Sequence, residues 1–281
     1  MNGFSDIINN HKLQEDFHHM EKNLEIAILA SLEAGKRIME IYENEDFEVD
    51  FKGDDSPLTK ADLASHEIIM QHLAATDIPV LSEEGRDLSY EERKNWSSLW
   101  IVDPIDGTKE FIKKNGEFTV NIALVRDQKP VMGVIYVPAL KELYYAAENM
   151  GSFKVDDIVD FEGMESLESS AVKLPKKNLN KKFTVVASKS HLSEETKDYI
   201  SQLEEKHGEV DSISKGSSLK LCMVAEGKAD QYPRFAPTME WDTAAGQAIC
   251  TFAGKTVYDH KTGEEMLYNR EKLLNNWFLV K

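Results

Sequence analysis

Two aspartates three residues apart carry the clearest chemical signal in this chain. Asp103 and Asp106 lie in Trp-Ile-Val-Asp-Pro-Ile-Asp-Gly-Thr, residues 100–108. We expect an apolar strand to end at Asp103, because the following proline blocks its continuation and Gly107 permits a tight turn. Both carboxylates and the Ile105 carbonyl could then face one space. Such oxygen ligands suit Mg²⁺, which usually keeps several waters and shares substrate phosphates. The alternative is that both aspartates only cap a turn.

Four further acidic residues, in three segments, lie at the end of an expected strand or at the start of an expected helix. Glu83 and Glu84 end the strand-like run Pro-Val-Leu-Ser, and only one of two adjacent side chains easily faces a shared site. Asp242 lies where a helix is expected to begin, which is also an ordinary capping position. Asp62 closes Thr-Lys-Ala-Asp, a capping-box pattern. Each signal is weak alone, and their combination favours an enzyme.

The elements that must position these residues alternate between helices and strands. Apolar residues at three- and four-residue spacing predict a helix from Leu24 to Tyr42. Residues 1 to about 20, with three histidines, predict a frayed polar arm, and residues 47–52 a short strand or hairpin. Further helices are expected at 59–75, 194–206 and 241–251, and strands at 78–82, 99–102, 119–125, 131–137, 143–147 and 183–187. This interleaving favours a mixed α/β or layered α+β fold. A polar stretch within 151–180 divides the chain into two expected lobes, 1–180 and 181–281.

Composition narrows the class of function. The chain has 281 residues, 33 Lys plus Arg against 50 Asp plus Glu, and a net charge of −17. Nucleic-acid binding is not expected of so acidic a chain. The negative charge does not exclude a small phosphorylated substrate, provided that metal ions screen the acidic residues of the site. The two cysteines suggest reduced buried thiols. With neither a signal-peptide pattern nor an apolar run of 18 residues, we expect a cytoplasmic protein without a membrane-spanning segment.

Taken in order, these motifs resemble the signature set of the inositol monophosphatase superfamily. They are Glu83-Glu84, Asp103-Pro-Ile-Asp106-Gly-Thr108 and Trp241-Asp242-Thr-Ala-Ala-Gly. The resemblance implies a metal-dependent, lithium-sensitive phosphomonoesterase with an alternating αβαβα sandwich. It also implies a bound metal set of two or three Mg²⁺ ions.

Residue roles follow from that resemblance. Asp62 and Thr108 match the pair that activates the attacking water. The implied metal ligands are Glu83, Asp103, Asp106, Asp242 and the Ile105 carbonyl. The implied substrate contacts are Glu83, Gly107, Thr108, His191, Ser217, Lys220, Arg234 and Asp242.

Four segments resemble the 3′(2′),5′-bisphosphate nucleotidase (CysQ-type) branch. They are residues 109–111 and 115–124, Ser-Lys-Ser-His at 188–191 and Gly-Ser-Ser-Leu-Lys at 216–220. The implied reaction converts adenosine 3′,5′-bisphosphate, a by-product of sulfate assimilation, to AMP and phosphate. An inositol monophosphatase or fructose-bisphosphatase-like activity is an alternative. A haloacid-dehalogenase-type phosphatase and a non-catalytic metal- or nucleotide-binding module are weaker ones, and a homodimer is left open.

Overall fold

The computed structural model describes residues 3–44, 49–51, 57–176, 182–187 and 193–281. The expected substrate contact His191 lies outside the described residues. Among the residues that are described, no helix has the length and apolar character needed to cross a membrane.

A seven-stranded sheet forms the centre of the molecule, in the order β3-β4-β5-β6-β7-β8-β9. Strands β3 and β4 are parallel, and the remaining neighbours are antiparallel. The bounds are β3 Val80–Ser82, β4 Ser98–Asp106, β5 Thr119–Arg126, β6 Lys129–Val137, β7 Glu142–Ala147, β8 Gly151–Val155 and β9 Val172–Lys173. The expected strands of the first lobe are therefore present, within a few residues at their ends.

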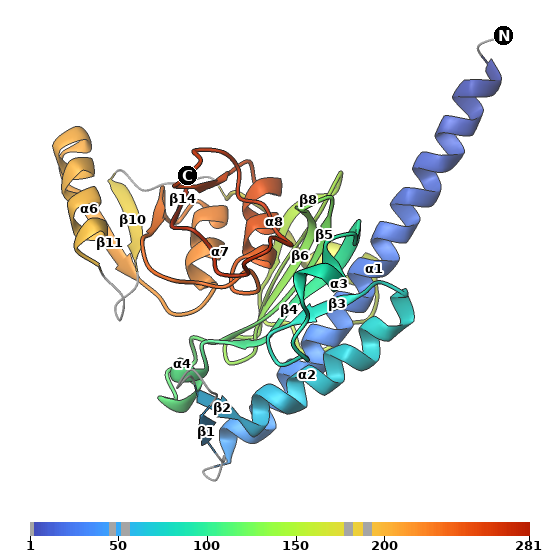
Figure 1. Ribbon diagram of the computed structural model, residues 1–281, viewed down its shortest axis with the longest axis horizontal. Helices are drawn as coiled ribbons and strands as arrows, with labels where there is room; N and C mark the ends of the chain where they lie inside the picture. The colour runs from blue at the N-terminus through green and yellow to red at the C-terminus, as the bar shows by residue number, and fades with distance from the viewer. Residues whose placement is uncertain (1–2, 45–48, 52–56, 177–181, 188–192) are drawn as a thin grey trace.

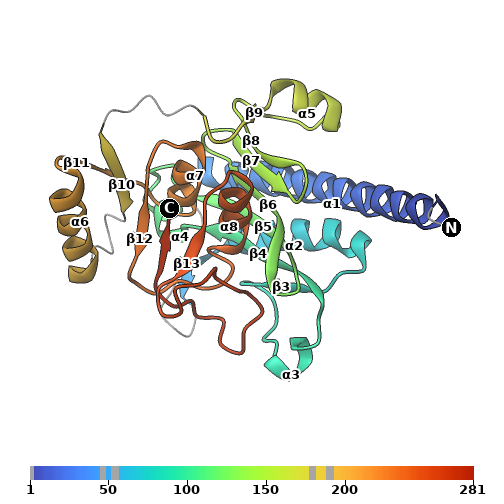
Figure 2. The same cartoon turned by 90° about the horizontal axis from the view of Figure 1, so that it is seen from above.

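Helices cover both faces of this sheet. One face packs against α1 (Gly3–Glu43) and α2 (Lys60–Leu73), and the other against α8 (Ala244–Phe252), which contacts α7 (Leu219–Glu226). The short elements at the edges are β1 Val49–Phe51, β2 Pro57–Thr59, the 3₁₀ turn Ala74–Thr76, α3 Tyr90–Arg93, α4 Thr108–Ile112 and α5 Met164–Ser170. Figures 1 and 2 show the sheet between these two helix pairs.

A second strand layer and an outer helix complete the fold. Strands β10 (Phe183–Ala187) and β11 (Val210–Ser214) are parallel, while β12 (Tyr232–Arg234), β14 (Phe278–Val280) and β13 (Val257–Asp259) form an antiparallel sheet. An isolated bridge from Val185 to Gln231 joins the two sheets. Helix α6 (Glu194–His207) lies outermost (Figure 1). The layers alternate as α, β, α, β and α, which confirms the expected fold class.

Side chains of the central strands alternate between two cores, because successive residues of a strand point to opposite faces. In β4, Trp100 and Val102 pack toward α1 and α2, whereas Leu99 and Ile101 pack toward α7 and α8. Close packing on the second face requires a glycine at position 133. A Cβ there would lie 2.4 Å from the Ala245 carbonyl oxygen. The sheet and α8 therefore meet almost backbone to backbone.

The N-terminal segment differs from expectation. Helix α1 begins at Gly3 rather than near Leu24, so the prediction of a frayed arm over residues 1–20 is wrong for its described part. The packed half of α1 supplies the nucleus, and extending an existing helix costs far less than starting one. The expected division near residue 180 falls at 177–181, outside the described residues, and stays a prediction.

Candidate active site

A one-residue irregularity in β4 brings two aspartates to the same face of the sheet. Asp103 pairs with Asn121 and Asp106 with Thr119, so three steps along β4 match two along β5. Residues three apart in a regular strand point to opposite faces, and the extra residue cancels that offset. The strand therefore continues to Asp106, and the prediction that it ends at Asp103 is wrong. Proline is tolerated inside such a bulge, and the Pro104 carbonyl accepts a 2.8 Å hydrogen bond from the Ser65 hydroxyl of α2.

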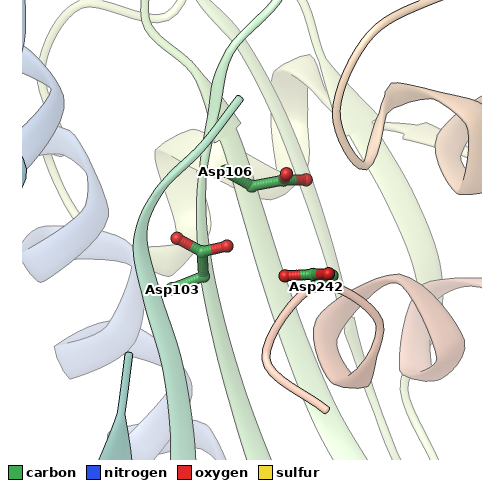
Figure 3. Close-up of side chains that lie close together, drawn as sticks. All are labelled: Asp103, Asp106 and Asp242. Carbon is green, nitrogen blue, oxygen red and sulfur yellow. The ribbon is translucent and has the colours of Figure 1, made fainter. Parts of the chain in front are cut away.

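Asp242 joins these two aspartates from the turn that precedes α8. One carboxylate oxygen from each of Asp103, Asp106 and Asp242 lies within 4.8 Å of the others. Figure 3 shows the three side chains converging, two from β4 and one from the α8 turn. The Asp242 carboxylate is anchored by a 2.9 Å hydrogen bond from the Met239 backbone amide.

These carboxylates line a cavity of about 250 Å³, here called the carboxylate cavity. Its wall consists of Glu83, Asp103, Ile105, Asp106, Gly107, Thr108, Lys109, Glu110 and Asp242. Glu84, also a described residue, lies outside that wall. Glu83 is held beside β4 by a 3.1 Å hydrogen bond from its amide to the Val102 carbonyl. All five expected metal-ligand residues therefore border one space.

The donor set fits a hard divalent cation. The buried Asp103 Oδ1 atom has no hydrogen-bond partner within the described part of the chain, and such an atom ordinarily needs one. Oxygen ligands and clustered negative charge are what Mg²⁺ binds in proteins.

Burial and mutual repulsion act strongly on this cluster. Desolvation, followed by the charges of Glu83, Asp106 and Asp242, raises the pKa of Asp103 well above its ordinary value. Desolvation, followed by the charge of Asp106, raises the pKa of Asp242 to about 8. A bound cation would reverse both effects, because opposite charge favours the ionised carboxylate.

A hydrogen-bonded pair formed by Asp62 and Thr108 adjoins the carboxylate cavity. Thr108 donates a 3.1 Å hydrogen bond from its hydroxyl to Asp62 Oδ1. The other oxygen, Asp62 Oδ2, accepts bonds from the Thr59 amide at 2.8 Å and the Thr59 hydroxyl at 2.6 Å. Asp62 therefore caps α2 with one oxygen and holds Thr108 with the other. Gly107, with φ of +96°, occupies a left-handed conformation that favours glycine and immediately precedes α4.

A larger cavity of about 350 Å³, here called the distal cavity, adjoins the carboxylate cavity. The two share Asp106, Gly107, Lys109, Glu110 and Asp242 in their walls. The distal wall adds Ser217, Lys220 and Arg234. Lys220 is buried, and its ammonium donates to the Ser217 carbonyl at 2.6 Å and the Lys215 carbonyl at 3.2 Å. Burial lowers its pKa to about 8.

Several wall residues were not expected from the sequence. Lys109 and Lys113 of α4 border the distal cavity, and their position directly after the Asp-Gly-Thr motif was the available signal. Ser218 hydrogen-bonds Asp106, but a serine beside an expected contact is not distinctive in sequence. Tyr232 and Phe278, also in the distal wall, come from strands that were not predicted.

Comparison with known proteins agrees with this arrangement. Residues 19–279 match the model of the inositol monophosphatase family. The chain belongs to the inositol monophosphatase family. Among curated family members, the 3′(2′),5′-bisphosphate nucleotidase CysQ of Salmonella typhimurium is 47% identical over 251 residues, covering 88% of this chain and 94% of that protein. CysQ of Escherichia coli K12 is 45% identical with the same coverage.

Solved structures of this family share the fold. CysQ from Bacteroides thetaiotaomicron superposes with a TM-score of 0.86 and 53% identity, covering 93% of this chain and 97% of that chain. An inositol monophosphatase of Thermotoga maritima has a TM-score of 0.70 at 23% identity and supports the fold alone. The expected family and its CysQ-type branch are confirmed. The haloacid-dehalogenase alternative loses its support, because the whole fold matches another family.

The raised pKa of Asp242 predicts how stability depends on pH when divalent ions are removed with a chelator. Between its ordinary value of 3.8 and about 8, the folded chain holds a proton that the unfolded chain has lost. The free energy of unfolding should therefore fall as pH rises through that window. Thermal unfolding midpoints in EDTA would show this fall, and Asp242→Asn should make it shallower. An equal pH slope in both proteins would contradict the assignment, and the same series with Mg²⁺ is the control.

Proposed function

We propose that this chain is a Mg²⁺-dependent 3′(2′),5′-bisphosphate nucleotidase that converts adenosine 3′,5′-bisphosphate to AMP and phosphate. The observation that carries the proposal is the junction of the two cavities. The carboxylate cavity offers a metal-binding floor, and the adjoining distal cavity has the size of a small-molecule site with buried and half-buried cations in its wall. The names of the CysQ relatives supply the substrate class.

The cation would be held by the carboxylates of Glu83, Asp103, Asp106 and Asp242 and by the Ile105 carbonyl, all in the wall of the carboxylate cavity. When bound, two or three Mg²⁺ ions supply charge neutralisation at the attacking and leaving oxygens of an in-line displacement. We further propose that Li⁺ inhibits by competing at this site.

Asp62 and Thr108 would prepare the attacking water. Because the Thr108 hydroxyl donates to Asp62, the lone pairs of its oxygen are available to accept a hydrogen bond from water. A proton leaving that water can then pass through Thr108 to Asp62 Oδ1. The two Thr59 bonds hold Asp62 in place for this transfer.

The substrate would span both cavities. We place the 3′-phosphate against Gly107 and Thr108, with Glu83 and Asp242 beside it, since these residues line the carboxylate cavity. The rest of the nucleotide would extend along Ser217, Lys220 and Arg234 in the distal wall. His191 stays a predicted contact from the sequence. A cytoplasmic location, a link to sulfate assimilation and a homodimer likewise stay predictions.

Loss of one metal ligand should abolish most of the activity. Asp103→Asn or Asp106→Asn removes several kcal/mol of charge stabilisation, so kcat should fall by at least about 100-fold. Phosphate release at saturating Mg²⁺ measures this, with the exposed Asp87→Asn as a matched control. Li⁺ should inhibit the unchanged protein at Mg²⁺ concentrations that support turnover. Full activity of either ligand variant would refute the metal assignment.

The Asp62–Thr108 pair should govern turnover rather than binding. Thr108→Ala should lower kcat by about 10²- to 10⁴-fold with little change in KM, because positioned proton transfer has that magnitude. Asp62→Asn should show the same loss and also lose about 0.5–2 kcal/mol of stability, since Asp62 also caps α2. Steady-state kinetics and thermal unfolding on the same samples separate the two roles. Thr108→Ser, which keeps the hydroxyl, is the control, and an undiminished kcat in Thr108→Ala would remove Thr108 from the mechanism.

Distal contacts should determine discrimination between substrates. Arg234→Ala and Lys220→Ala should lower kcat/KM for adenosine 3′,5′-bisphosphate by about 10- to 100-fold, the magnitude of hydrogen bonds to charged groups. Slow turnover of 4-nitrophenyl phosphate should change little, and the exposed Lys182→Ala should change neither rate.

Equal losses on both substrates would instead indicate that Lys220 and Arg234 have a structural role. The bonds from Lys220 to two backbone carbonyls are consistent with such a role. Faster hydrolysis of inositol phosphate or fructose bisphosphate by the unchanged protein would refute the nucleotidase proposal and leave the family membership intact.

A further inference from the structure

One buried serine touches both segments that carry the clustered aspartates. The Ser218 hydroxyl oxygen lies 2.7 Å from Asp106 Oδ2 and 2.8 Å from the backbone carbonyl of Asp242. It also lies 3.0 Å from the side-chain amide of Asn121, which donates to it. Ser218 is 3% exposed and Asn121 is 1% exposed.

We propose that Ser218, oriented by Asn121, is a positioning residue of the metal site that sets the spacing between Asp106 and Asp242. The proposal rests on the metal dependence in the proposed function. It assigns Ser218 no contact with the reacting phosphate and places its effect in the affinity of the carboxylate cavity for the cation.

The count of protons supports this role. A serine hydroxyl carries one proton and can accept through its lone pairs. The Asn121 amide occupies one lone pair, so the Ser218 proton is directed to the acceptors Asp106 Oδ2 and Asp242 O. The Ser217 hydroxyl lies 2.8 Å from Asp106 Oδ2 and 2.6 Å from the Thr119 hydroxyl, so its single proton is shared between these two oxygens. Both serine hydroxyls therefore contact Oδ2 of Asp106, and within the described part of the chain neither contacts Oδ1 of Asp106.

The orientation of Asn121 is itself determined by β5. Thr119 donates a 2.9 Å bond from its hydroxyl to Asn121 Oδ1, which directs the amide nitrogen toward Ser218. These two polar residues lie in a strand that is otherwise apolar and buried until its final Arg126. Burying polar groups costs free energy unless each finds a partner. Here Asn121 donates to Ser218, which in turn contacts the carboxylate of Asp106.

The geometry also explains why such a bridge is needed. Asp106 ends β4 and Asp242 precedes α8, so two segments far apart in sequence must hold repelling carboxylates close together. Ser218 immediately precedes α7, which packs against α8. A hydroxyl that touches both segments limits how far they can separate. Hydrogen-bonding partners of metal ligands typically change metal affinity by about 10- to 100-fold when removed.

A calorimetric titration of the full-length chain with Mg²⁺, without substrate, tests the proposal. Ser218→Ala should raise the Mg²⁺ Kd by about 10- to 100-fold. Ser152→Ala is the matched control, because Ser152 is equally buried and its hydroxyl has no partner in the described part of the chain. Its Kd should match that of the unchanged protein. Should Ser218→Ala fail to fold, Ser218→Cys keeps the approximate size and replaces the hydroxyl with a weak donor.

A double-mutant cycle tests the orienting role of Asn121. Asn121→Leu alone should also weaken Mg²⁺ binding, yet add little in the Ser218→Ala background, because both changes remove the same interaction. Fully additive losses would refute action through Ser218.

Other outcomes separate this proposal from the proposed activity. An unchanged Kd in a folded Ser218 variant would overturn it, and so would a fall in activity at unchanged Mg²⁺ affinity, which would indicate substrate contact. If the unchanged chain binds Mg²⁺ and the Ser218 variants bind it weakly, but no nucleotide is hydrolysed, the inference stands and only the substrate assignment fails.

Discussion

The active site depends on holding one buried and several partly buried carboxylates close together. Asp103, Asp106 and Asp242 repel one another, and burial adds to the cost of their charge, as the raised pKa values of Asp103 and Asp242 show. The single extra residue in β4 is what places Asp106 on the same face as Asp103. A regular strand would send these side chains to opposite faces of the sheet and leave no common binding space.

The layered fold supplies the rigidity that this cluster requires. Strand β4 is packed on both faces, with Trp100 in one core and Ile101 in the other, so the bulge has little freedom to relax. Both covering layers deliver functional groups to the same end of the strand. Helix α2 provides Asp62 from one layer. The other layer provides Ser218, which immediately precedes α7, and Asp242, which lies in the turn before α8.

Charge is divided locally in a chain that is acidic overall. A net charge of −17 would repel a nucleotide bisphosphate, yet Lys220 and Arg234 lie in the wall of the distal cavity beside the carboxylates. In the proposed reaction, cations would neutralise the phosphate at one end, and these two residues would bind the substrate at the other. Asp62 also has two roles, since its side chain both stabilises the start of α2 and orients Thr108.

The sequence by itself determined the local features. Runs of β-branched and aromatic residues bounded by turn residues identified the central strands. The Thr-x-x-Asp pattern placed the start of α2, and the spaced carboxylates indicated a metal site and the family. The strand and helix signals rest on residues close in sequence, and the family signal rests on short motifs that are each recognisable locally. The tertiary structure decided the bulge that aligns Asp103 with Asp106, the double role of Asp62, and the bridge from Asn121 through Ser218 to Asp106 and Asp242. Each of those depends on contacts between distant segments, and a serine or asparagine has the same appearance in sequence whether it is exposed or buried against a carboxylate.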